Sequence, residues 1–322
     1  MAGGGALYEF TLPERFHKVA EIELGETDQV REQSLTELRK WIENNPRILE
    51  CRTDVNFLLK FLRFRKFSVT EAGEAIERYL VARQKHPKWF QGMDPREEGF
   101  RLLQESGVVV EMGQDEHCRT ILIMRSKQYS PDRDTSTSII KHLVGFVDLL
   151  TEQEEVQIGG VRVWIDYKNM PLRLITLFGP IELAGCIPVF TKTLPLRIRE
   201  VHGVGIPKAA VAISTLALTF ASEKFRKRVQ CHASIEEGKK CMPPNLWPTE
   251  FGGSIDAQQL GERMSETFEQ NRDFLLSFDA MAIDVKQKFD SPISEEQNQT
   301  TQQLSPDADN DGVENFRDLK VD

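Results

Sequence analysis

Basic side chains crowd one stretch of an otherwise acidic chain. Between Lys192 and Arg228 the sequence holds eight lysines and arginines and two acids, a local charge of +6, whereas the 322-residue chain has a net charge of −9. Guanidinium and ammonium groups bind phosphate groups, and arginine does so through paired hydrogen bonds. Each basic residue near an anionic lipid surface contributes about 1 kcal/mol to binding. The stretch therefore predicts contact with an anionic membrane.

A second chemical pattern lies near the C-terminus and resembles a calcium-binding loop. Asp307, Asp309 and Asp311 have the oxygen spacing of such a loop, and Gly312 occupies its turn position. The twelfth position holds Asp318 in place of the bidentate Glu, and the preceding segment lacks an apolar helix. A solvated acidic tail explains the same residues, so these four aspartates are kept only as a weak calcium candidate.

Patterns typical of catalysis are missing from the sequence. It contains no GxSxG, P-loop, GxGxxG or HExxH motif, and none of its six histidines adjoins an evident nucleophile. Cys231, His232 and Cys241 lie close together along the chain, but their spacing matches no zinc pattern. We therefore expect no enzymatic activity, no catalytic residues, no cofactor and no firm metal site.

The basic stretch frames a helix with an unusual distribution of apolar residues. A strand over 196–202 is followed by the chain breakers Gly203, Gly205 and Pro207, and a helix is predicted to start near Pro207. Such a helix is ordinarily buried, but its basic surroundings favour a lid between an apolar cavity and a membrane. One side of the helix holds Ile213, Leu216 and Phe220, and the other holds Val211 and Leu218.

The pattern of the remaining chain predicts an α/β fold with a small N-terminal helical bundle. Helical spacing prevails after Thr27, whereas short apolar runs alternate with helices after Gly107, which indicates a partly parallel sheet. Gln, Asn, Ser and Asp dominate the last part, which has a charge of −6 and is expected to be disordered. The expected units are a loosely docked arm (1–26), a helical domain (27–95), an α/β domain (96–255), a helical segment (256–290) and an acidic tail (291–322).

Several protein classes are disfavoured by composition. The N-terminus lacks the pattern of a signal peptide, and no apolar run reaches the roughly 18 residues of a membrane span. Five scattered cysteines without a CxxC pair indicate reduced thiols in the cytosol. Aromatic and basic residues alternate over 57–67, but an amphipathic helix packed on its neighbour explains them better than nucleic-acid binding does.

Four motifs in order resemble the CRAL-TRIO lipid-binding family. They are FLLKFLRFRKFSVTEA at 57–72, GVRVWIDYKNM at 160–170, LPLRIREVHGVGIP at 194–207 and WPTEFGG at 247–253. The resemblance spans about residues 30–285, and the most similar group is that of the alpha-tocopherol transfer protein and the cellular retinaldehyde-binding protein. It implies a helical N-terminal unit beside an α/β lipid cage with a mobile gate helix.

The resemblance also implies specific binding residues. Phosphoinositide headgroups would be bound by Arg197 and Arg199 before the gate and by Lys224 and Arg228 after it. The resemblance implies a bound hydrophobic ligand such as tocopherol, a retinoid, a carotenoid or a similar lipid. Two family positions that can be Ser in a tocopherol pocket fall on Leu143 and Val147. This removes hydrogen-bonding groups for tocopherol, and the more uniformly apolar pocket suits a carotenoid, sterol, retinoid or acyl chain as well. The implied pocket residues are Ile140, Leu143, Val147, Val161, Val163, Ile165, Val189, Phe190, Leu194, Leu196 and Ile198.

The sequence thus leads to a hypothesis of lipid transfer. A cytoplasmic protein would bind one small hydrophobic molecule, associate reversibly with phosphoinositide-containing membranes and exchange the molecule through the gate helix. The alternative is a phosphoinositide-binding trafficking adaptor that holds a structural lipid and recruits a protein partner through its acidic tail. A lipid-modifying enzyme is the least favoured hypothesis because no catalytic motif supports it.

Overall fold

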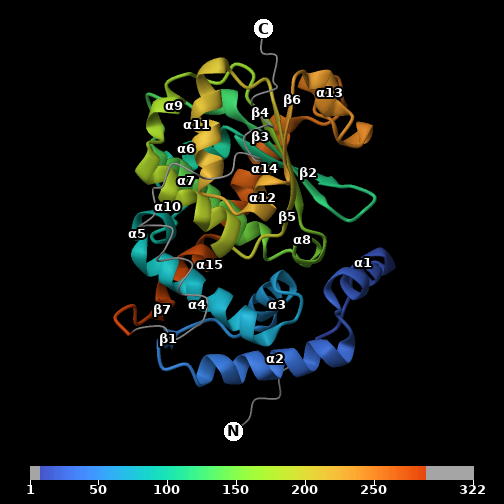
Figure 1. Cartoon of the computed structure of the whole chain (residues 1–322), viewed down its shortest axis with the longest axis vertical. Coiled ribbons are helices and arrows are strands. Elements are labelled where there is room, and N and C mark those ends of the chain that lie inside the picture. The colour runs from blue at the N-terminus through green and yellow to red at the C-terminus, as the bar shows by residue number, and fades with distance from the viewer. Residues whose placement is uncertain (1–7, 288–322) are drawn as a thin grey trace.

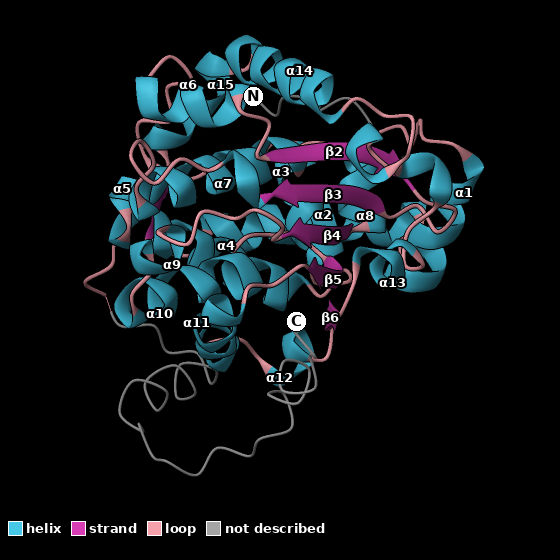
Figure 2. Cartoon of the chain, turned by 90° about the horizontal axis from the view of Figure 1, so that it is seen from above, coloured by secondary structure: helices cyan, strands magenta, loops and turns pink. Residues whose placement is uncertain are grey.

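A mixed sheet forms the centre of the computed structural model, which describes residues 8–287 (Figure 1). Within these residues, five strands lie in the order β2-β3-β4-β5-β6, as Figure 2 shows. β2 is antiparallel to β3, whereas β3, β4, β5 and β6 are mutually parallel, which confirms the predicted α/β class. The strands are β2 (Val109–Gln114), β3 (Thr120–Arg125), β4 (Val161–Asp166), β5 (Ile198–Val204) and β6 (Val229–His232).

The strand predicted over 196–202 corresponds to β5 and is shifted along the chain. β5 begins at Ile198, two residues later than predicted, and continues to Val204. The cause is Pro195, which has no N–H to donate. A tight turn forms around it, in which the Leu196 N–H donates to the Leu194 carbonyl (2.7 Å).

Alternating side chains give the sheet two apolar faces. Ile121 and Ile123 of β3 pack with Trp164 and Trp247 on one face, whereas Leu122 packs into the main core on the other. Helices cover both faces, as parallel pairing requires. These helices are α6 (Glu98–Glu105), α7 (Ser136–Leu150), α8 (Glu154–Gly159), α9 (Leu174–Leu177), α10 (Pro180–Pro188), α11 (Lys208–Thr219), α12 (Glu223–Arg226), α13 (Ile235–Lys239), α14 (Ala257–Gln270) and α15 (Arg272–Ser277).

The N-terminal unit is helical, as predicted, and it contains one small sheet. The Thr27 side chain caps α2 and the Asp54 side chain caps α3, whereas the Ser68 side chain before α4 makes no capping hydrogen bond. Strand β1 (Ile48–Glu50) pairs with β7 (Ala282–Ile283) from the far end of the described chain. The helices are α2 (Asp28–Glu43), α3 (Val55–Phe64), α4 (Val69–Lys85) and α5 (Pro87–Phe90).

The first described residues are packed against the α/β part, in contrast to the loosely docked arm expected from the sequence. α1 (Glu14–Val19) continues into the π-helical turn η1 (Ala20–Leu24). Phe16, Ala20 and Leu24 are buried there in a small cluster with Ile158 of α8. The sequence missed this docking because only a few apolar residues carry it.

A buried ion pair fastens the helical unit to the α/β part. The Arg63 guanidinium donates two hydrogen bonds to the Glu26 carboxylate (2.8 and 2.9 Å), and both side chains have no exposed surface. Arg63 also donates to Glu154 and Gln157 of α8 (2.7 and 2.8 Å). Because the buried charge is paired and hydrogen-bonded on several sides, it is tolerated in the interior.

Candidate functional site

An apolar cavity of about 300 Å³ lies on the face of the sheet covered by α7, α10 and α11. This volume falls within the range of small-molecule sites. Aliphatic and aromatic side chains from β3, β4, α7, α9, α10 and α11 make most of its wall. The lining residues are Met124, Ser126, Tyr129, Ile139, Ile140, Leu143, Ile165, Tyr167, Met170, Leu174, Ile175, Phe178, Leu183, Cys186, Ile187, Phe190, Ala210, Ile213, Ser214 and Ala217.

Two phenol groups give this wall a polar element. Tyr129 and Tyr167 line the cavity, and no other residue between 8 and 287 hydrogen-bonds to either hydroxyl group. Burial raises the pKa of both phenols, that of Tyr167 to about 12, so both remain protonated at neutral pH. A protonated phenol both donates and accepts a hydrogen bond. The wall can therefore hold one polar end of an otherwise apolar molecule.

The residues implied for the pocket are distributed between the cavity wall and the surrounding core. Ile140 and Leu143 of α7, Ile165 of β4 and Phe190 line the cavity. The others do not line it and pack as buried or half-buried core residues among the described residues, and their contact with a ligand stays a prediction. They are Val147, Val161, Val163, Val189, Leu194, Leu196 and Ile198.

The sequence missed most of the lining residues, especially those over 170–187. That stretch reads as an apolar helical run, and only the fold shows that it is broken into α9 and α10, which turn Leu174, Leu183 and Ile187 toward α11. The prediction from sequence also missed the phenols of Tyr129 and Tyr167. Each tyrosine follows the end of a strand, β3 or β4, and the place of that strand in the sheet decides whether the side chain points into the cavity.

Helix α11, the predicted gate, is the yellow helix labelled in Figure 1. Its side chains form one side of the cavity. Ile213 lines the cavity, and Leu216 and Phe220 pack on the main core. Val211 and Leu218 face a second cluster built around β5 and β6. Ala210 is the one buried residue of α11. Most apolar side chains of this helix are therefore half-exposed. Its movement as a gate stays a prediction.

Two of the four predicted basic residues, Arg197 and Arg199, contact one carboxylate. Glu23 of η1 accepts hydrogen bonds from Arg119 (2.5 Å), Arg197 (3.2 Å) and Arg199. Arg197 also donates to the Ile158 carbonyl (2.6 Å). Arg228 lies beside them. The guanidinium group of Arg228 donates to the Ile198 carbonyl, and Lys224 is exposed one helical turn earlier.

The charges in this cluster are not balanced. Burial opposes ionisation of Glu23, but the hydrogen bonds and charges of Arg119 and Arg199 prevail and lower its pKa to about 2. Burial, followed by the charge of Arg199, lowers the pKa of Arg197 to about 9. Glu23 acts in the opposite direction and raises the pKa of Arg197, but three guanidinium groups surround this one carboxylate. The cluster retains an excess of positive charge.

None of the helices among residues 8–287 is long and apolar enough to cross a bilayer.

Comparisons with known proteins agree with the observed fold. Residues 104–253 match the family described as "CRAL/TRIO domain", and residues 27–100 match "Pinta-like, UBA domain". The chain is 29% identical to Clavesin-1 of Pongo abelii over 251 residues, covering 77% of this chain and 71% of the relative. It is 27% identical to human Clavesin-2 over 279 residues, covering 85% of each.

A solved structure, "Crystal structure of Sfh5", is 11% identical with a TM-score of 0.45, covering 83% of this chain and 99% of that one. The matched range 104–253 contains all five strands of the central sheet, the cavity and α11. Over residues 104–253, the α/β part of this chain is therefore similar to the CRAL/TRIO domain family.

Proposed function

We propose that this protein binds one small hydrophobic molecule and exchanges it at anionic membranes. The observation that carries the proposal is the apolar cavity beneath α11. Burial of apolar surface contributes about 25 cal/mol per Å², which suffices to hold a lipid without covalent chemistry. The CRAL/TRIO match supports a lipid as the bound molecule.

The wall of the cavity constrains the class of cargo. An apolar molecule with a single hydroxyl or carbonyl group would fill the aliphatic wall and pair with Tyr129 or Tyr167. Tocopherol, retinoids and oxygenated carotenoids have this chemistry. Leu143 and Val147, at positions where the family can have Ser, offer no hydrogen-bonding side chain, so the two phenols would bind the polar end of the cargo instead.

Membrane exchange is supported by the surface around the cavity. Lys224 and Arg228 lie beyond the end of α11, and the arginine cluster at Glu23 adds an excess of positive charge. Exposed apolar side chains, those of Leu172 and Ile181, adjoin the elements that line the cavity. We infer that phosphoinositide headgroups bind the basic residues while α11 moves to release the cargo. The protein would then be cytoplasmic and peripherally membrane-associated.

Cargo binding is tested by native mass spectrometry of the full chain, with identification of what co-purifies. If the protein is empty, it is incubated with α-tocopherol, retinal, a carotenoid and phosphatidylcholine. One hydrophobic molecule per chain supports the proposal. A chain that takes up none of them has a filled core, and the lipid-transfer function is then refuted.

Membrane binding is tested separately with Lys224→Glu. Co-sedimentation uses phosphatidylcholine vesicles with and without phosphatidylinositol bisphosphate. Removal of one basic group costs about 1 kcal/mol, so binding to the phosphoinositide vesicles should weaken at least about fivefold. Lys40→Glu on α2 makes the same charge change at another exposed site and serves as the control. Equal weakening in both variants would leave only a general effect of net charge and contradict a site at Lys224.

A further inference from the structure

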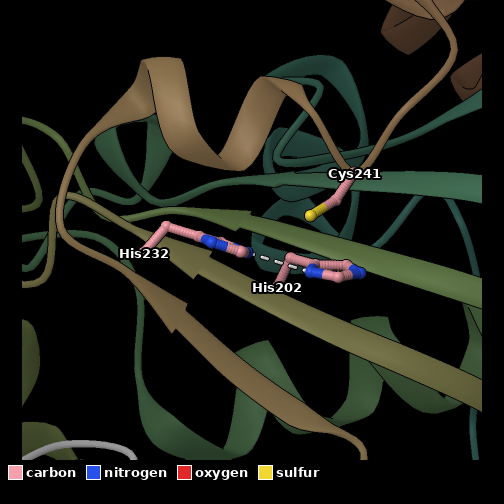
Figure 3. Close-up of side chains that lie close together, drawn as sticks. All are labelled: His202, His232 and Cys241. Atoms are coloured by element: carbon pink, nitrogen blue, oxygen red, sulfur yellow. Dashed lines mark hydrogen bonds between the residues drawn. The ribbon is translucent and has the colours of Figure 1, made fainter.

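Three metal-ligating side chains converge on the face of the sheet opposite the cavity. His202 of β5 and His232 of β6 lie diagonally on neighbouring parallel strands, because His202 pairs with Gln230 and His232 with Val204. Cys241 follows α13, which crosses this face. Figure 3 shows the Cys241 sulfur directed toward the two imidazole rings. The potential ligand atoms of the three side chains all lie within 4.8 Å of one another.

The separations approach those of a tetrahedral zinc site. Nδ1 of His202 and Nε2 of His232 are 3.0 Å apart. Two nitrogens bound at about 2.0–2.1 Å in tetrahedral geometry would be about 3.3 Å apart, so the imidazoles need to separate by only a few tenths of an ångström. Cys241 needs a larger adjustment, and it lies in the turn after α13, where its side chain is half-exposed.

A second layer of contacts already orients these ligands. Nε2 of His202 lies 3.0 Å from the Glu200 carboxylate, which leaves Nδ1 directed at His232. Arg162 on the adjacent strand contacts Glu200 (2.8 Å) and donates to the Cys241 carbonyl. A carboxylate behind a ligating histidine fixes its tautomer and raises its basicity. Arg162 therefore positions both Cys241 and Glu200, the carboxylate that orients His202.

Close packing brings the cysteine segment to the sheet. Gly238 of α13 lies against Trp164 so tightly that a Cβ atom there would approach the indole to 2.2 Å. The Trp164 ring lies 6.3 Å from the His202 ring and 6.1 Å from the His232 ring. The indole forms an apolar wall on one side of the three ligands, which limits the access of water.

We propose that His202, His232 and Cys241 bind one Zn²⁺ ion, with the fourth position open to water. Two imidazoles and a thiolate are typical zinc ligands, and an open position is typical of a site that exchanges a ligand. Binding releases the Cys241 thiol proton to solvent. The proton between the imidazoles moves to Nδ1 of His232, so that Nε2 can coordinate. The ion would join β5, β6 and the turn after α13.

The test measures zinc bound by the full chain after chelator dialysis and reconstitution with Zn²⁺ alone. We expect one ion per chain, and at least about tenfold weaker binding in Cys241→Ser. With Co²⁺ in place of Zn²⁺, a thiolate-to-metal charge-transfer band should appear and be lost in the same variant. Co²⁺ should also quench tryptophan fluorescence, since Trp164 lies beside the site.

Cys231→Ser is the matched control. Cys231 belongs to the same strand as His232, but its side chain lies on the other face of the sheet and outside the cluster. This variant should retain the ion and the charge-transfer band. His232→Gln is a second variant that should lose them, and circular dichroism checks the fold of each chain. Absence of bound zinc in the wild type, or equal binding in Cys231→Ser and Cys241→Ser, would overturn the assignment.

Discussion

Replacing Glu23 by Gln should weaken the fold and strengthen membrane binding at the same time. Glu23 is the carboxylate shared by Arg119, Arg197 and Arg199. Its removal leaves the shape of the side chain nearly unchanged but deletes the negative charge. The three guanidinium groups then repel one another without compensation, while the positive charge available to a lipid phosphate rises by one.

The stability change follows from the pKa of Glu23. The ordinary value is 4.5, and the folded protein lowers it to about 2, which corresponds to at most about 3 kcal/mol. Because the side chain is 27% exposed, solvent screening reduces the contribution to about 1–2 kcal/mol. Since the folded pKa is the lower one, this stability is complete above about pH 4.5 and is lost as the pH falls toward 2.

In urea unfolding at neutral pH, the free energy of unfolding of Glu23→Gln should therefore be about 1–2 kcal/mol lower than that of the wild type. This difference should disappear in acid. Vesicle co-sedimentation should show about fivefold tighter binding of the variant to phosphoinositide vesicles. Glu21→Gln removes an exposed acid from the same turn and controls for net charge. If Glu21→Gln matches Glu23→Gln in both measurements, the carboxylate does not mask the arginines and the reasoning is wrong.

Three further changes test the cavity and the packing. Ala217→Phe should fill the cavity and abolish cargo uptake in native mass spectrometry, whereas Ala212→Phe on the exposed side of α11 should not. Arg63→Ala leaves the buried Glu26 carboxylate with only its longer contact to Arg31 (3.4 Å) and should cost about 3–5 kcal/mol in urea unfolding; a loss below 1 kcal/mol would contradict this. Gly238→Ala should lower the melting temperature, because the new Cβ collides with Trp164; an unchanged melting temperature would oppose the close packing.

Local patterns predicted the elements that depend on their own residues. The helical spacing after Thr27 and the apolar run from Val161 mark α2 and β4 closely, because each buries a face that the sequence spells out. The resemblance to the CRAL-TRIO family then supplied the order of the units.

The missing parts depend on segments that meet only in the fold. Glu23 lies far along the chain from Arg197, and no local pattern pairs them. The cysteine and histidines of the proposed zinc site have no motif spacing, because the adjacency of β5 and β6 brings His202 to His232. The residues of the cavity wall could not be predicted without the directions of α9 and α10, which the sequence does not show. The calcium pattern at Asp307 and the acidic tail lie outside the described residues.

The pairing of β1 with β7 has a consequence for how the chain folds during synthesis. Ile48 lies opposite Ile283, so the small sheet of the N-terminal unit receives its second strand from the end of the described chain, where β7 lies beside β1 in Figure 1. Domains ordinarily fold in order as they leave the ribosome. Here the N-terminal helices must wait with an unpaired strand edge until the last described segment emerges, and contacts of such high sequence separation form slowly. The order of synthesis thus leaves that edge of β1 exposed until β7 has been made.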